Sequence, residues 1–254
     1  MLEEPYRWIE AVRNRREYLE DQLQNATPVV GLTYEHGVLL LTSTPGPRKL
    51  FEIYNQVGFA AIGHPADIEK LRKAVIDIAH VEAFNFSASD ISLHRLVSFG
   101  LGPLIKAAFD EIFRSPYTAR ALMTELDPPA DQDAFYMIDA DGSFFSARHA
   151  AAVAGTIEGS AAILKKLKPL DGAGLSLQEG LQQALEAWAV GRLAANGEEG
   201  QEPDERAVRD FLVAELPGLR IEAAVLDRTM PTKTKFRLLQ PAALEDVLAA
   251  YSTS

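Results

Sequence analysis

The side chains that could carry chemistry in this sequence are its histidines, two serines and one acidic turn. The histidines show no HExxH or comparable metal-ligand spacing, and two of them, His80 and His94, fall in predicted helices, where a structural role is expected. Ser143 and Ser146 lie on a predicted strand without the G-x-S-x-G elbow that exposes a nucleophile. The turn at 139–142, DADG, lacks the remaining ligands of a calcium loop. We therefore expect neither a metal nor a cofactor. The complete set of histidines is His36, His64, His80, His94 and His149.

Composition narrows the class of protein further. The chain has 254 residues, 47% of them hydrophobic, and a formal net charge of −11, which argues against nucleic acid as a partner. It has no cysteine, so disulfides, thiolate catalysis and Cys-ligated zinc are excluded. No apolar run approaches the roughly 20 residues that span a membrane, and the acidic start MLEEPYRWIEAV is unlike a signal peptide. We expect a cytoplasmic protein without a membrane partner.

The stretch 27–67 sets the order of the predicted elements. Apolar residues on both sides of the turn 35–37, EHG, predict a β-hairpin. A loop rich in Pro and Gly follows, and then two more apolar segments, 49–54 and 57–62, which predict a third and a fourth strand. The segment 63–67, GHPAD, ends the last strand and begins a helix, because Pro is favoured in the first turn and acids stabilise it.

The rest of the chain alternates between helical and strand patterns. Helices are predicted from the 3.6-residue periodicity of apolar side chains, and strands from short apolar runs between turn signals. A Ser and Asp cluster at 87–90 is predicted to cap a long helix. The predicted helices are 66–84, 87–114, 156–167, 176–193, 207–216 and 241–251, and the predicted strands are 120–126, 134–138, 143–149, 219–226 and 235–239.

This order predicts an α+β fold with four layers, in which two stacked sheets lie between helices as an αββα sandwich. No internal repeat or linker divides the chain, so we expect a mobile segment at 1–7 and a single domain over 8–254. The domain opens with a narrow amphipathic helix at 8–23. That helix could lie on the domain's own sheet, or its thin apolar stripe could pack against a neighbouring subunit.

Four segments, in this order, resemble proteasome subunits. They are TPVVGLTYEHGVLLL, RKLFEIYNQVGFAAIGHPADIEKL, MIDADGSFFSARHAAAVAGTIEGSAAILKKL and LRIEAAVLDRTMPTKTKFRLLQPAALEDVL, the last similar to the C-terminal strands and helix of bacterial α-type subunits. The resemblance covers nearly the whole chain and departs most at 196–218, where an acidic insertion is expected. It implies the αββα fold of N-terminal-nucleophile hydrolases.

Catalytic β-type subunits of that family use an N-terminal threonine and a nearby lysine, and the resemblance places Thr27 and Lys49 at those two positions. An exposed threonine amine would act as the base for its own hydroxyl, and the lysine would lower the pKa of the nucleophile. The supporting groups are missing, however. Thr42-Ser43 replaces the expected acid, Gly155 replaces the assisting serine, and Ala26 replaces the glycine before a processed threonine. We therefore expect no catalytic residue here.

The helix before Thr27 instead resembles the permanent N-terminal helix of bacterial α-type subunits. The resemblance then implies a non-catalytic subunit of a seven-membered outer ring, stacked on catalytic β subunits, which admits unfolded protein substrates. Residues at the N-terminus, including Glu3, Glu4, Pro5 and Tyr6, would form the gate of this ring.

Lys49 acquires a different role in an α-type ring. The resemblance implies that it binds the C-terminal carboxylates of a ring-shaped ATPase activator, with His64 flanking the pocket and Ala26 forming its floor. An internal ion pair of Lys49 with Glu52, or with a neighbouring subunit, stays open as an alternative. Two other functions also stay open, namely an active threonine peptidase in which processing exposes Thr27, and a ring scaffold without a role in proteolysis.

Overall fold

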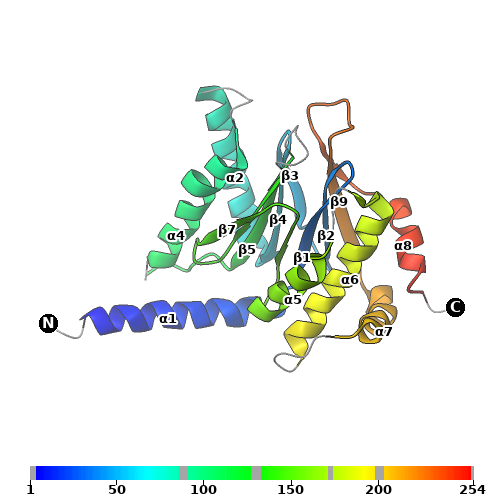
Figure 1. The fold of residues 1–254 in the computed structure, drawn as a ribbon. Coiled ribbons are helices and arrows are strands. Elements are labelled where there is room, and N and C mark those ends of the chain that lie inside the picture. Colours follow the sequence, from blue (N-terminus) through cyan, green and yellow to red (C-terminus); the bar gives the residue numbers. More distant parts are fainter. Residues whose placement is uncertain are drawn as a thin grey trace.

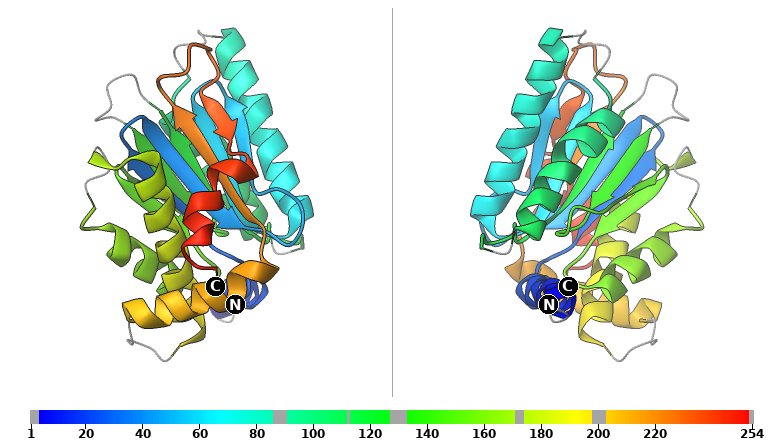
Figure 2. Two further views of the ribbon diagram at one scale, coloured as in Figure 1. Left: turned by 90° about the vertical axis from the view of Figure 1, so that its right-hand side faces the viewer. Right: turned by 90° about the vertical axis from the view of Figure 1, so that its left-hand side faces the viewer.

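The computed structural model describes residues 4–85, 91–111, 113–126, 133–170, 174–197 and 203–252, with residues 4–7 as backbone alone. Two five-stranded antiparallel sheets lie face to face between two layers of helices (Figure 1 and Figure 2). The strand order is β10-β9-β2-β1-β8 in the first sheet and β3-β4-β5-β6-β7 in the second. The predicted four-layer αββα sandwich is therefore confirmed.

The first sheet is built from distant parts of the chain. Its central hairpin pairs β1 with β2, and the outer strands β8, β9 and β10 come from the second half of the sequence. The second sheet is a meander in which each strand pairs with the next. The first sheet contains β1 (Val29–Tyr34), β2 (Gly37–Ser43), β8 (Ala150–Val153), β9 (Ile221–Asp227) and β10 (Phe236–Leu238), and the second contains β3 (Leu50–Tyr54), β4 (Val57–Gly63), β5 (Ala119–Glu125), β6 (Ala134–Ile138) and β7 (Phe144–Ala147).

Helices cover the outer face of each sheet. On the second sheet lie α2 (Pro65–Asn85), α3 (Leu93–Arg95), the π-helix η1 (Leu96–Leu101) and α4 (Gly102–Asp110). On the first sheet lie α5 (Ile157–Leu167), α6 (Leu177–Asn196), α7 (Glu205–Glu215), η4 (Leu216–Gly218), η5 (Pro241–Ala243) and α8 (Glu245–Ala249). Buried apolar side chains fill three separate layers, one under each helical face and one between the sheets. Both faces of the central strands are covered, so β1 and β2 are buried along their whole length and consist mostly of apolar residues.

The hairpin turn that the sequence predicted is confirmed and depends on Gly37. This residue has a φ of 147°, and a Cβ at this position would lie 2.0 Å from the carbonyl oxygen of Leu226 on β9. Glycine is therefore the residue that fits both the left-handed backbone and the close approach of the neighbouring strand.

Helix α1 (Glu4–Leu23) begins four residues before the predicted start at residue 8. Pro5 lies in its first turn, where no intrahelical partner exists for a backbone N–H, so the missing donor of proline costs nothing. The C-terminal part of the helix packs on its own domain, where Leu19 and Leu23 contact Phe109. Its N-terminal part extends away from the body (Figure 1), and the side chains of Trp8 and Ile9 are 45% and 64% exposed.

Two other predictions of elements were wrong. Ser92, rather than the cluster at 87–90, caps the helix after α2 by accepting the Arg95 N–H, and 87–90 lie outside the described residues. The long helix predicted up to residue 114 is divided by η1 and ends at Asp110. Pro103, the second residue after η1, offers no N–H to Phe99, and the Gly102 N–H bonds to the carbonyl oxygen of Val97, five residues back.

A further error concerns the strand predicted at 143–149. It ends at Ala147, and the next residues, Ala150–Val153, form β8, a strand that joins the other sheet. The run of alanines carries no strand signal of its own, since alanine is depleted in strands. Burial between α5 and the second sheet explains why this segment is extended.

Part of the 196–218 stretch is ordered as helix. Asn196 ends α6, and α7 packs on α6 through the rings of Trp188 and Phe211, whose centroids are 6.2 Å apart. Residues 198–202 lie outside the described residues. Whether 196–218 is an insertion stays a prediction.

Arg120 joins α1 to both sheets. It lies on β5 and is 6% exposed, and its guanidinium donates to Asp139 at 2.9 Å, to the carbonyl oxygens of Ala154 at 3.1 Å and Gly155 at 2.9 Å, and to Glu20 on α1. One buried side chain therefore satisfies acceptors from three parts of the fold.

We predict that Arg120→Met lowers the free energy of unfolding by roughly 2–4 kcal/mol, because two buried carbonyls lose their donors and methionine cannot replace them. Denaturant unfolding of the isolated subunit measures the change. Arg13→Met is the control, since Arg13 forms only an exposed pair with Glu17 and its loss should cost less than about 1 kcal/mol. Equal effects of the two substitutions would contradict this role of Arg120.

Candidate functional site

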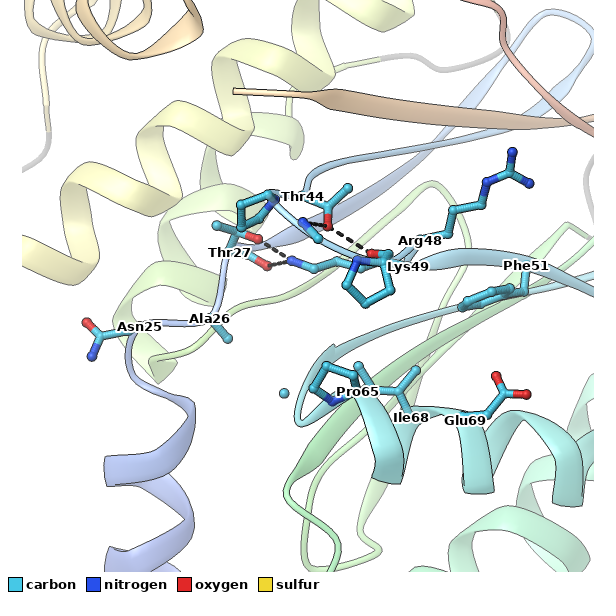
Figure 3. Close-up of a pocket in the computed structure, with 14 residues that line it drawn as sticks. Asn25, Ala26, Thr27, Thr44, Arg48, Lys49, Phe51, Pro65, Ile68 and Glu69 are labelled. Atoms are coloured by element: carbon cyan, nitrogen blue, oxygen red, sulfur yellow. Dashed lines mark hydrogen bonds between the residues drawn. The ribbon is translucent and has the colours of Figure 1, made fainter. Parts of the chain in front are cut away.

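A cavity of about 460 Å³ lies where the segment between α1 and β1, the loop between β2 and β3, and the start of α2 meet (Figure 3). Lys49, the last residue before β3, forms part of its wall. Thr44 orders the β2–β3 loop, since its hydroxyl donates to Pro47 at 2.9 Å and accepts the Gly46 N–H at 3.1 Å. The lining residues are Asn25, Ala26, Thr27, Thr44, Pro45, Gly46, Pro47, Arg48, Lys49, Phe51, Gly63, Pro65, Ile68 and Glu69.

The amine of Lys49 contacts neutral oxygens only. It donates to the carbonyl oxygens of Ser43 at 3.1 Å and Thr27 at 3.4 Å, and to the hydroxyl of Thr27. No carboxylate in the described part of the chain forms an ion pair with it, so the internal pair with Glu52 considered above is wrong. Figure 3 shows the amine extending toward Thr27, while the side chain of Arg48 points away from it.

This environment shifts the titration of Lys49. The pKa of its amine is lowered from the ordinary value of 10.5 to about 8, mainly because burial disfavours the charged form. The Arg192 guanidinium also lowers this pKa, and the Glu222 carboxylate raises it. An amine with a pKa of about 8 is still mostly protonated at neutral pH. The cavity therefore contains a positive charge that no acid in direct contact neutralises, which is what an incoming carboxylate requires.

Thr27 lies beside Lys49, as the resemblance implied, but it is not arranged as a nucleophile. Its hydroxyl donates to the Ser43 carbonyl oxygen at 2.8 Å while accepting from the lysine. Its backbone nitrogen is in a peptide bond with Ala26, and Leu23, four residues earlier, is fully buried at the end of α1. Without a free amine the hydroxyl has no base.

The groups that would support a nucleophile are also missing from the structure. Ser43 stands where an acid was expected, and its buried hydroxyl has no hydrogen-bond partner among the described residues. At Gly155, the position of the assisting serine, a Cβ would lie 2.3 Å from the carbonyl oxygen of Leu23 and 2.6 Å from that of Gln24. The backbone that follows α1 thus occupies the space that a serine would need.

The structure separates the other predicted site residues. Ala26 lines the cavity, but His64 does not, because its exposed ring turns toward the start of α2 and its Nδ1 accepts the Ala66 N–H at 3.3 Å. Of the predicted gate residues, Glu3 lies outside the described residues, and Glu4, Pro5 and Tyr6 belong to the first turn of α1.

Sequence reasoning missed three residues of this region. Phe51 and Ile68 supply an apolar wall opposite Lys49, and Glu222 comes from β9, far along the chain. The periodic spacing of apolar residues in the helix at 66–84 indicates that Ile68 is buried. No local signal connects Glu222 with Lys49. Within the described ranges there is no group of three or more His, Asp or Glu that could hold a metal, and no helix long and apolar enough to cross a membrane.

We predict that the amine of Lys49 in the folded protein reacts with acetic anhydride with a midpoint near pH 8, since the neutral amine is the reactive form. In the urea-unfolded chain the same amine should titrate near its ordinary pKa of 10.5, because burial no longer opposes its charge. Peptide mass spectrometry across a pH series measures both midpoints. A midpoint that does not move on unfolding would contradict the buried environment described here.

Comparisons with known proteins agree with the fold. The model of the family described as "Proteasome subunit" matches residues 23–196. A proteasome subunit alpha of Streptosporangium roseum is 30% identical over 249 residues, covering 96% of this chain and 85% of the relative. Those of Frankia casuarinae and Streptomyces griseus are 29% and 28% identical, each over 96% of this chain and over 95% and 84% of the relative. The chain therefore belongs to the proteasome subunit family, and the relatives that match almost its whole length are α subunits.

Proposed function

We propose that this α-type subunit forms the outer ring of a bacterial proteasome, gates the entry of unfolded protein substrates and docks a ring-shaped ATPase through Lys49. Its place in the ring is that of a non-catalytic subunit, assembled with catalytic β subunits. The observation that carries the docking proposal is the amine of Lys49, which lies at the cavity and bonds only to neutral oxygens among the described residues. The proposal also locates the assembly in the cytoplasm, where such an ATPase would act.

The pocket has the chemistry of a site for the end of a peptide chain. A C-terminal carboxylate would pair with Lys49, whose charge is only partly screened because the amine is half-buried. Phe51 and Ile68 offer apolar surface for the side chains that precede the carboxylate. In the free subunit the ammonium is held by three neutral acceptors, so the incoming carboxylate displaces weaker interactions with a stronger one.

The exposed N-terminal part of α1 supports the gating proposal. The C-terminal part of α1 is held on the domain by Leu19, Leu23 and the side chain of Arg15. The Arg15 guanidinium donates to the carbonyl oxygens of Ala108 at 3.1 Å and Arg114 at 2.7 Å. The first turns lie beyond these contacts, with Trp8 and Ile9 exposed. A helix with a fixed base and an apolar free end suits packing against a neighbouring α1 around a ring axis.

We predict that Lys49→Ala weakens the binding of apolar peptides with a free C-terminal carboxylate to the assembled barrel by about 10–100-fold, the cost of losing a hydrogen bond to a charged group. Fluorescence anisotropy measures the affinity, and the same peptides as C-terminal amides should bind equally weakly to both proteins. Lys49→Arg retains the charge and should keep part of the affinity. Lys70→Ala is the matched control, since Lys70 is exposed on nearby α2 and pairs with Asp67. Unchanged affinity in Lys49→Ala would favour a ring scaffold without docking.

We predict that deleting residues 2–7 raises the unstimulated hydrolysis of short fluorogenic peptides by the barrel several-fold, because the deletion shortens the free end of α1 that would obstruct the pore. The deletion combined with Lys49→Ala should show the same increase, since the gate and the pocket lie at opposite ends of α1. Hydrolysis that stays at the level of the intact barrel would count against a gate formed by these residues.

A further inference from the structure

Glu222 on β9 connects the first sheet to the residue that begins the second. Its carboxylate accepts the backbone N–H of Lys49 at 3.1 Å and that of Leu50 at 3.3 Å. Leu50 is the first residue of β3, whereas Glu222 pairs with Thr42 near the end of β2. The chain leaves one sheet at Ser43 and enters the other at Leu50, so this carboxylate fixes the point at which the loop returns.

The geometry of this contact leaves the side chain of Lys49 available. Both carboxylate oxygens are used by backbone amides, and the lysine amine reaches in another direction, to Thr27 and Ser43. A carboxylate bound directly to the amine would neutralise it and compete with a ligand. Glu222 instead holds the backbone from which Lys49 projects, and its negative charge acts on the amine from a distance.

The charges facing Lys49 come from several elements. Arg192 on α6 opposes the protonated amine, while Glu222 on β9 favours it. On the rim of the cavity, Arg48 belongs to the loop itself, and Glu69 on α2 is engaged by Arg72 at 2.6 Å. The segment after α1 contributes only uncharged residues, Asn25, Ala26 and Thr27. The carboxylate of Glu222 thus favours the protonated amine, against burial and a neighbouring arginine.

We propose that Glu222 is the positioning residue of the Lys49 pocket, because its carboxylate holds the lysine backbone in place and puts a negative charge near the amine without binding it. The effect on the amine is a property of the folded subunit, and only the consequence for docking rests on the proposed function. Because the carboxylate has two separable tasks, one variant can remove the charge while another disturbs the position.

The charge is tested by Glu222→Gln in the assembled barrel, with acetic anhydride labelling of Lys49 across pH. An amide oxygen still accepts one backbone N–H, but the charge is gone, so the labelling midpoint should fall by several tenths of a pH unit to about one unit. A fall of one unit from pH 8 would lower the protonated fraction at pH 8 from about one half to about one tenth. Glu215→Gln, at an exposed position on α7, removes the same charge elsewhere and should leave the midpoint in place. An unchanged midpoint in Glu222→Gln would overturn the proposal.

The position is tested by Glu222→Asp, which keeps the charge on a side chain one methylene shorter. It should leave the midpoint near pH 8 and weaken the binding of carboxylate peptides several-fold, because it cannot reach both amides. If Glu222→Asp leaves binding at the wild-type level, the positioning role is wrong. A barrel that binds no carboxylate peptide would refute docking. The labelling of Lys49 needs no docking partner, so its midpoints would still decide whether the charge of Glu222 acts on the amine.

Discussion

The pocket depends on a half-buried ammonium group that is solvated by the protein without being neutralised by it. Removing a charge from water is expensive, and burial is the main reason why the pKa of Lys49 lies at about 8 instead of 10.5. Three neutral oxygens of Thr27 and Ser43 and the more distant charge of Glu222 offset part of that cost. The rest of this desolvation free energy is not compensated in the free subunit. A carboxylate ligand that pairs with the ammonium group would compensate for it.

The positions of Thr27, Lys49 and Gly155 explain why a fold associated with nucleophilic catalysis contains no nucleophile here. Thr27 and Lys49 lie within hydrogen-bond distance, as they would in a catalytic relative, yet the backbone that follows α1 continues into Thr27 and lies against Gly155. A serine at 155 and α1 therefore exclude each other sterically. With the threonine amine in a peptide bond, the contact between Thr27 and Lys49 serves to hold the lysine rather than to activate the hydroxyl.

Sequence reasoning reached the layers of the fold because the hairpin, the helix after 63 and the later helices carry strong local signals, such as the glycine at 37 and the capping box at Ser176. It missed β8, an alanine-rich strand at the edge of the first sheet, which is extended because it is buried between α5 and the second sheet. In the pocket, Lys49, Thr27 and Ala26 were reached through resemblance to a family. Glu222 could not be reached, because its contact with residue 49 spans 173 positions and follows from how the two sheets stack.

The two walls of the cavity are fixed independently, and this bears on how tightly it can bind. On one side Arg120 holds Glu20 near the end of α1 and the carbonyl oxygens of Ala154 and Gly155, so the segment that leads to Thr27 has a rigid base. On the other side Glu222 holds the backbone of Lys49. Only short segments separate each anchor from the cavity. A ligand that enters therefore meets a preformed site and orders little of the protein, so that more of the energy of its carboxylate pair appears as affinity.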